Sequence, residues 1–167
     1  MTNNKVPVRR MYVEGPDGQI HLRVAMPPEP TGRPLFCFHL SPVSGIVYEN
    51  WIAEMGRDRL AVAPDTPGYG MSDPPREQPT IGDFARTMEA VMDKLEVGEA
   101  DVMGYHTGSK TSVELARQQP ERIKHLILVS APVYTEEDLA RQNADMGQPD
   151  ELQEDGSHLL ETWAALW

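Results

Sequence analysis

Residues 101–116 read Asp-Val-Met-Gly-Tyr-His-Thr-Gly-Ser-Lys-Thr-Ser-Val-Glu-Leu-Ala. This stretch joins a short apolar run to a segment with helical spacing, through a turn that has a glycine on either side of His106. Gly104 and Gly108 indicate that the strand and the helix approach each other too closely for a Cβ atom. The sequence therefore predicts a strand, a tight turn and a helix, with the His106 side chain presented at the apex of the turn.

Short apolar runs alternate with amphipathic segments from residue 34 onward. The apolar runs are 35–39, 59–63, 101–103 and 123–130, and the amphipathic segments are 48–55, 81–95 and 111–118. Strands that are separated by single helices pair in parallel through right-handed crossovers. The pattern therefore predicts an α/β fold with a doubly wound, mostly parallel sheet and helices on both faces.

An antiparallel strand pair is predicted before this region. Residues 6–14 and 18–26 have the composition of strands, and they are joined by the run Gly-Pro-Asp-Gly at 15–18. Such a run is a strong signal for a hairpin turn. We expect the antiparallel pair to open the fold.

Size and charge limit the possible functions. The chain has 167 residues, 40% of them hydrophobic, and a formal net charge of −11. An acidic protein without clustered Lys and Arg is not expected to bind nucleic acid or an anionic membrane. The N-terminus has no apolar secretion signal and no stretch approaches the roughly 20 apolar residues of a membrane span, so we expect a cytoplasmic protein. The single cysteine, Cys37, lies in an apolar run, which is typical of a buried structural thiol.

Three loops are expected at the carboxyl ends of the strands, where ligands bind in such sheets. They span residues 39–45, 65–75 and 104–108. The first resembles the His-Gly-x-Pro loop of the α/β-hydrolases, and the second is similar to their Asp-x-x-Gly-x-Gly-x-Ser-Asp loop. The third resembles their nucleophile elbow, Gly-x-Ser-x-Gly, and residues 116–132 match the helix and strand that follow it. The order and spacing agree with this family from about residue 6 to residue 134.

The resemblance implies a site at this edge of the sheet. In the family, the backbone N–H groups that stabilise an oxyanion correspond here to Ser41 and Thr107. The resemblance places His106 as the catalytic residue and His39, Leu40 and Tyr105 as substrate-binding residues. The sequence departs from the family pattern at two positions, because histidine replaces the elbow serine and Leu40 replaces a glycine.

Residues 135–167 resemble the start of a helical lid. They contain nine acidic residues and one arginine, and the acids at 136–138 are typical of the first turn of a helix. We therefore expect two parts: a partial hydrolase-like core at 1–134, which lacks the last strands of the family, and the start of the lid at 135–167. The acid and the second histidine of the family would lie on strands that this chain does not show. We therefore expect either a fragment of a longer protein or a chain that completes its fold by pairing as a homodimer.

Several functions remain open at this stage. The imidazole of His106 could act as a nucleophile, as a general base on water, or as a binding group without chemistry. The favoured hypothesis is a hydrolase that acts on a small ester, lactone or related carbonyl compound. The alternatives are a catalytically impaired binding or oligomerisation module and, from residues 104–111, a phosphate-binding loop for nucleotides. No metal cluster or cofactor motif is recognised.

Overall fold

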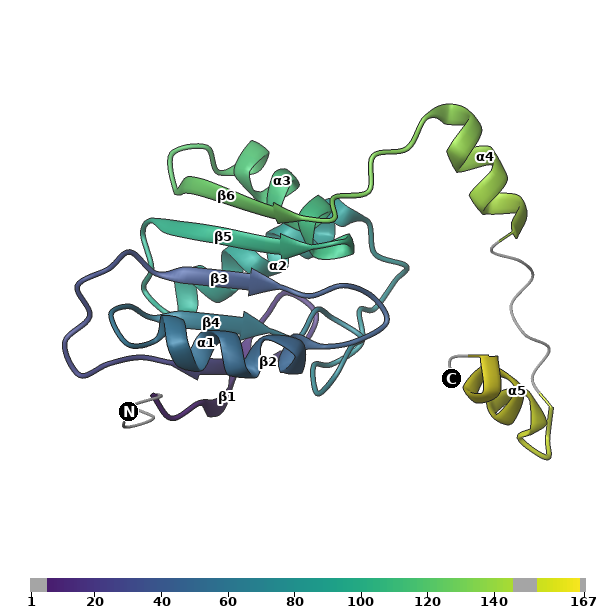
Figure 1. Cartoon of the computed structure of the whole chain (residues 1–167), viewed down its shortest axis with the longest axis horizontal. Helices are drawn as coiled ribbons and strands as arrows, with labels where there is room; N and C mark the ends of the chain where they lie inside the picture. The colour runs from purple at the N-terminus through teal and green to yellow at the C-terminus, as the bar shows by residue number, and fades with distance from the viewer. Residues whose placement is uncertain (1–5, 146–152, 166–167) are drawn as a thin grey trace. The chain divides into compact units, whose positions relative to one another are not determined.

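A computed structural model of the chain describes residues 6–145 and 153–165. Six strands form one sheet in the order β1-β2-β4-β3-β5-β6 (Figure 1). The strands are β1 (Arg9–Glu14), β2 (Gln19–Ala25), β3 (Leu35–Phe38), β4 (Ala61–Pro64), β5 (Ala100–Tyr105) and β6 (Ile123–Val129). The helices are η1 (Gly45–Tyr48), α1 (Glu49–Met55), α2 (Ile81–Lys94), α3 (Thr107–Gln118), α4 (Glu136–Asp145) and α5 (Ser157–Ala165).

The sheet is mixed and mostly parallel, as the sequence predicted. Strands β4, β3, β5 and β6 pair in parallel, whereas β1 and β2 form an antiparallel pair and β2 is antiparallel to β4. In the register of the sheet, Phe38 lies opposite Gly104 and Tyr105 lies opposite Val129. The carboxyl ends of β3, β5 and β6 therefore meet at the turn that carries His106.

Helices cover both faces of the sheet. Helices α2 and α3 lie behind the sheet in the view of Figure 1, and α1 lies in front of it. The core on the α2–α3 side includes Phe36, Phe38, Val102 and Leu115, and the smaller core on the α1 side includes Leu35, Cys37 and Ile52. Successive residues of β3 thus point to opposite cores, because side chains alternate across a strand.

The structure differs from the predicted element bounds at two helices. Helix α3 begins at Thr107 rather than at residue 111, directly after the turn. Its first turn is buried through Gly108 and Ser109, which are small or polar residues, so hydrophobic spacing does not reveal it. The segment predicted as one helix at 48–55 consists of the 3-10 helix η1 followed by α1, and the Ser44 side chain caps η1 by accepting from the Ile46 N–H.

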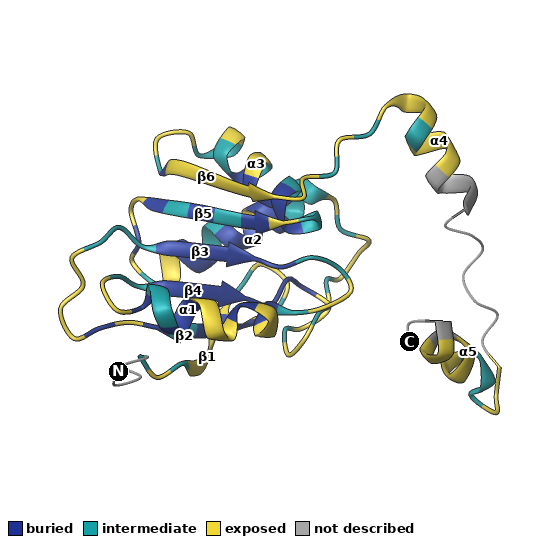
Figure 2. Cartoon of the chain, in the orientation of Figure 1, coloured by how far each residue is buried: buried dark blue, intermediate teal, exposed yellow. Residues whose placement is uncertain are grey.

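Strand β6 is an edge strand of the sheet, with exposed apolar residues at its end. Within the described residues it pairs with β5 alone. Its last four residues, 126–129, are large aliphatic side chains that are 37–45% exposed, whereas the central strands are buried (Figure 2). Charged residues flank the opposite edge strand, β1, at Arg9, Arg10 and Glu14. Because charges discourage edge pairing, β6 is the edge with the stronger tendency to accept another strand.

Residues 133–167 form a second compact unit, and residues 1–132 form the first. Helix α4 begins with reciprocal hydrogen bonds, because Thr135 Oγ1 accepts from the Asp138 N–H and Asp138 Oδ2 accepts from the Thr135 N–H. Helix α5 presents Leu159, Leu160 and Trp163 as exposed side chains. Leu166 and Trp167, which continue this run of apolar residues in the sequence, lie outside the described residues. Over the ranges 6–145 and 153–165, no helix has the length and apolar character that crossing a bilayer requires.

The packing of the core predicts how much stability the protein loses when a large side chain of β3 is truncated. Phe36 is 0% exposed and belongs to the cluster between the sheet and α2–α3. Phe36→Ala should lower the free energy of unfolding by about 3–5 kcal/mol, because it removes buried apolar surface and leaves a cavity. Val113→Ala, at an exposed position of α3, should change it by less than about 0.5 kcal/mol. Urea denaturation followed by circular dichroism measures both, and equal effects would contradict this account of the core.

Candidate functional site

The turn between β5 and α3 holds His106 in an unusual backbone conformation. Its φ is 51° and its ψ is −111°, a region that residues other than glycine rarely adopt. The His106 N–H donates to the Val129 carbonyl at 2.9 Å. The Ser109 hydroxyl, buried beneath the turn, lies 2.8 Å from the Gly104 carbonyl oxygen and 3.2 Å from that of Val129. These bonds fix the turn against the end of β6 and sustain its strain, which costs about 1–3 kcal/mol.

Glycine is required on both sides of the apex for steric reasons. A Cβ atom at Gly104 would collide with the backbone of Gly108 and Ser109. A Cβ atom at Gly108 would collide with the Phe38 carbonyl. The close approach that the sequence indicated is therefore present, and it also brings the start of α3 against the end of β3.

The two N–H donors predicted for an oxyanion come from neighbouring segments. Thr107 is the first residue of α3, and the N–H groups of a first helical turn have no acceptor within the helix. Ser41 lies in the loop 39–45, which continues from the end of β3 that contacts Gly108. Both residues are half-buried. Their role as a pair of donors stays a prediction.

His39 is a brace between two loops. It is 2% exposed. Its Nδ1 lies 2.8 Å from the Leu40 carbonyl oxygen, and its Nε2 lies 2.9 Å from the Thr66 backbone nitrogen. Because a carbonyl only accepts and an N–H only donates, Nδ1 carries the proton and Nε2 accepts. Burial lowers the pKa of His39, which keeps the ring neutral. The predicted contact of His39 with a substrate would therefore act through the loop that it braces.

A buried ionic cluster lies beside this brace. The Asp65 carboxylate is 0% exposed and binds two side chains of β2, Arg23 at 3.1 Å and His21 at 2.9 Å. It also accepts the backbone N–H groups of Gly45 at 2.8 Å and Met71 at 3.0 Å. The sequence did not reveal the partners in β2, because alternating apolar and polar residues at 20–25 also fit a strand with one face in solvent.

The remaining predicted residues, Leu40 and Tyr105, and two further histidines lie in different surroundings. Leu40 is half-buried, and Tyr105 is exposed at the end of β5, next to the apex. His125 is exposed at the opposite end of β6, where its Nδ1 lies 2.8 Å from Asp101 Oδ1. His158 is in the second unit, where its Nδ1 accepts from the Gln153 N–H. Of these residues, the structure places Tyr105 at the elbow.

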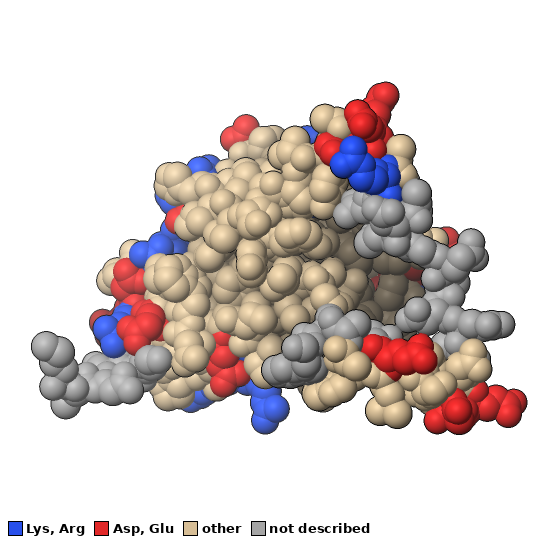
Figure 3. Space-filling model, turned by 45° about the vertical axis from the view of Figure 1, so that its right-hand side comes forward, with Lys and Arg blue, Asp and Glu red and all other residues tan. Residues whose placement is uncertain are grey.

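Uncharged side chains dominate the face near the strand ends. Figure 3 turns the carboxyl ends of β3, β5 and β6 toward the viewer, and the middle of the view, over the first unit, is occupied by residues other than Lys, Arg, Asp and Glu. Among the described residues, no group of three His, Cys, Asp or Glu side chains is arranged to hold a metal ion. The pocket expected between the loops 39–45, 65–75 and 104–108 stays a prediction.

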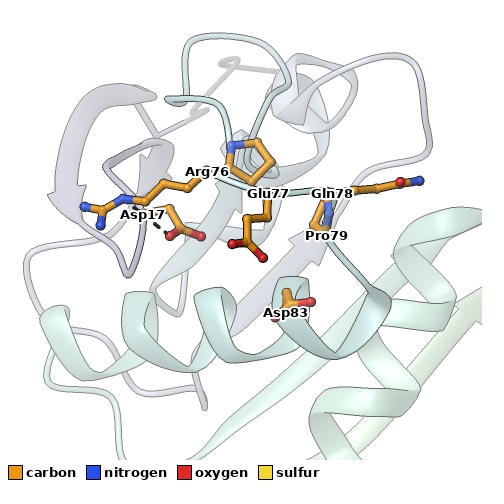
Figure 4. Close-up of a pocket in the computed structure, with 7 residues that line it drawn as sticks. Asp17, Arg76, Glu77, Gln78, Pro79 and Asp83 are labelled. Atoms are coloured by element: carbon orange, nitrogen blue, oxygen red, sulfur yellow. Dashed lines mark ion pairs between the residues drawn. The ribbon is translucent and has the colours of Figure 1, made fainter.

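A polar hollow of about 270 Å³ opens beside the β1–β2 turn (Figure 4). It is lined by Asp17, Pro75, Arg76, Glu77, Gln78, Pro79 and Asp83. Three of its charged groups have partners in the protein, because Arg76 Nε lies 3.8 Å from Asp17 Oδ1 and Asp83 forms the capping box of α2 with Thr80. Its lining includes none of the elbow residues.

Comparison with known proteins agrees with this geometry. Residues 38–167 match the family model of the alpha/beta hydrolase fold. The fold is also that of solved α/β structures, which include an epoxide hydrolase, CorEH, with a TM-score of 0.71 and 17% identity over 83% of this chain and 50% of that one. A second, the N-acyl homoserine lactonase AidH, has a TM-score of 0.67 and 23% identity over 86% of this chain and 61% of that one. The chain belongs to the α/β-hydrolase fold family.

Two curated relatives are hydrolases from Pseudomonas. A 2-hydroxymuconate semialdehyde hydrolase of Pseudomonas sp. (strain CF600) is 31% identical over 104 residues, which are 60% of this chain and 37% of the relative. A 2-hydroxy-6-oxo-2,4-heptadienoate hydrolase of Pseudomonas putida is 25% identical over 135 residues, which are 78% of this chain and 47% of the relative. The chain thus spans less than half the length of these two relatives.

The backbone strain at the apex predicts that glycine at residue 106 gives a more stable protein than alanine, the reverse of the usual order in a helix. At a φ of 51°, alanine keeps the strain of His106 and glycine does not. His106→Gly should therefore unfold with a free energy about 1 kcal/mol higher than that of His106→Ala. At Val113, inside α3, the order should be the usual one, with Val113→Gly about 1 kcal/mol less stable than Val113→Ala. The same order at both positions in chemical denaturation would show that the apex is not strained.

The buried ring of His39 predicts a loss of stability in acid. Its lowered pKa means that the unfolded chain binds a proton first as the pH falls. The contribution of His39 is complete above the pKa of an unfolded histidine, about 6.5, and is lost below it. His39→Gln, which can donate and accept but does not titrate near neutral pH, should lose less stability than the parent protein between pH 7 and pH 5. If urea denaturation shows that the free energy of unfolding falls equally with pH in the parent protein and in His39→Gln, the prediction is contradicted.

Proposed function

We propose that the protein hydrolyses a small ester, lactone or related carbonyl compound, with His106 as the catalytic residue. The observation that carries the proposal is the backbone conformation of His106 at a strand–helix turn. A strained turn is retained where the surrounding structure stabilises it, and such turns concentrate at functional sites. Within the described residues, no hydrogen bond holds the His106 ring, and the ring is half-buried. The imidazole is therefore available to a bound molecule.

The surroundings of the ring support stabilisation of an oxyanion. The Thr107 N–H follows the apex and lies at the positive end of the α3 dipole. The Ser41 N–H belongs to the loop that begins where β3 meets Gly108. Donors that are fixed before the reaction can each lower the barrier by about 3 kcal/mol, because they do not reorganise when charge develops.

The preferred route uses His106 as a general base. An unprotonated ring nitrogen takes a proton from water while the water oxygen attacks the carbonyl carbon. The carbonyl oxygen becomes an oxyanion, which accepts hydrogen bonds from the Thr107 and Ser41 N–H groups. When the tetrahedral intermediate collapses, the bond to the leaving oxygen breaks and the imidazolium returns its proton to that oxygen.

A nucleophilic route has the same residues and a different intermediate. One ring nitrogen attacks the carbonyl carbon, and the bond to the leaving oxygen breaks. That oxygen takes the proton of the other ring nitrogen and leaves as an alcohol, and water then hydrolyses the acyl-imidazole to the acid and the free ring. An early burst of alcohol release distinguishes this route from the general-base route, because a covalent intermediate accumulates only in the former.

The surface and the relatives support the proposed substrate class. The uncharged face near the strand ends (Figure 3) suits a neutral or weakly polar molecule. The lactonase among the similar structures was solved with N-butanoyl homoserine, and both curated Pseudomonas relatives are named as hydrolases. We propose for this chain the general class of carbonyl substrate, and not the individual compounds named for these relatives.

Turnover of a panel of aryl esters and lactones tests the proposal. His106→Ala should reduce kcat by about 10²-fold or more, since general acid–base catalysis contributes 10²–10⁴-fold. His125→Ala, a matched loss of an exposed histidine at the other end of the sheet, should leave turnover within about twofold of the parent protein. Turnover that does not respond to His106→Ala would rule out both chemical roles of the ring.

A binding or oligomerisation module is the second candidate. The exposed edge strand β6 and the exposed apolar residues of α5 favour it. A chain that lacks turnover and has the mass of a dimer in solution would support this candidate. The third hypothesis, a nucleotide site at residues 104–111, has less support, because the Thr111 side chain is buried in the protein and the family match points to hydrolases.

A further inference from the structure

We propose that Asp65 is a positioning residue: its carboxylate holds the loop 39–45 beside the elbow and so fixes the Ser41 N–H for the reaction. The inference rests on the proposed function, because it assigns a role to the Ser41 N–H. It concerns a buried ionic group that takes no part in the chemical steps described above.

One carboxylate joins a strand to two loops. Asp65 Oδ1 accepts from Arg23 Nη1 and from the Gly45 N–H, and Oδ2 accepts from His21 Nδ1 and from the Met71 N–H. The two side chains belong to β2, in the rigid part of the sheet. The two backbone N–H groups belong to different loops at the carboxyl edge. Each oxygen thus has one donor from the sheet and one from a loop.

Two consecutive residues, Asp65 and Thr66, hold the two ends of the loop 39–45. At its start, His39 Nε2 accepts from the Thr66 N–H, and at its end the Gly45 N–H donates to Asp65. Ser41 lies between these two anchors. The start of the loop also rests on α3, because Gly108 packs against the Phe38 carbonyl. The position of the Ser41 N–H relative to the elbow therefore depends on residues 65 and 66.

The loops close tightly around the carboxylate. A Cβ atom at Gly70 would collide with the Asp65 carboxylate. A Cβ atom at Gly45 would lie 2.7 Å from the Ala63 carbonyl oxygen and 3.0 Å from Asp65 Oδ1. Because there is no free space, a weaker bond to Asp65 cannot be replaced by a small shift of one loop.

Asp65→Asn tests the inference with little change of shape. An amide is uncharged and has one oxygen and one NH₂ group, so the Gly45 N–H either loses its acceptor or keeps a neutral acceptor that forms a weaker hydrogen bond. Asp101→Asn is the matched control. The Asp101 carboxylate also has an arginine and a histidine as partners, Arg33 at 3.0 Å and His125 at 2.8 Å. Across residues 6–145 and 153–165, no hydrogen bond of its side chain reaches a loop at the carboxyl edge.

Two readouts separate positioning from a general loss of structure. Asp65→Asn should lower kcat about tenfold or more, with KM within about threefold, because a misplaced oxyanion donor affects the transition state more than the bound substrate. The NMR amide resonances of Ser41 and Gly45 should move in Asp65→Asn. In Asp101→Asn both the kinetic constants and these two resonances should stay close to those of the parent protein.

A second substitution covers the case in which Asp65→Asn does not fold. Gly45→Ala displaces the same N–H from the same oxygen and leaves the carboxylate in place. It should produce the same fall in kcat with little change in KM. Gly98→Ala is its control, because a Cβ atom at Gly98 meets no atom within 4 Å.

The outcomes distinguish the two proposals. Turnover in the parent protein that Asp65→Asn or Gly45→Ala leaves unchanged would overturn the positioning role and leave the proposed function intact. A parent protein without turnover would overturn the proposed function. The amide resonances would then still test the contact, and an unmoved Ser41 resonance in both variants would overturn it.

Discussion

The close approach of α3 to the ends of β3 and β5 is the constraint on which the site depends. It is possible because neither Gly104 nor Gly108 carries a Cβ atom. It forces the connecting residue into a positive φ, and it brings the first turn of the helix beside the loop after β3. The apex, the first turn of the helix and the loop 39–45 are therefore arranged by one steric contact.

The sequence predicted the parts of the fold that depend on local chemistry. Alternation of apolar runs and amphipathic segments predicted the mostly parallel sheet, and the Gly-Pro-Asp-Gly run predicted the antiparallel pair. The glycines at 104 and 108 predicted the tight turn, because a steric requirement is visible in the residues themselves. The start of α3 was placed four residues too late, since its first turn is buried by small and polar residues and lacks an apolar period.

The buried ionic cluster could not be predicted in the same way. Residues His21, Arg23 and Asp65 are far apart in the chain and meet because β2 pairs with β4, with Leu22 opposite Pro64. Neither the length nor the composition of a strand gives this pairing. The bond between His39 and Thr66 has the same origin, since it joins loops that follow neighbouring strands. Contacts that follow from strand order require the structure.

The contacts that hold the turn do not involve the side chain at its apex. His106 is held through its backbone N–H, and the supporting contacts come from Ser109, Val129 and the two glycines. The imidazole itself contributes none of these contacts. The side chain at residue 106 can thus be exchanged without loss of the contacts that hold the turn, so the direction in which this position presents a side chain does not depend on which side chain it is.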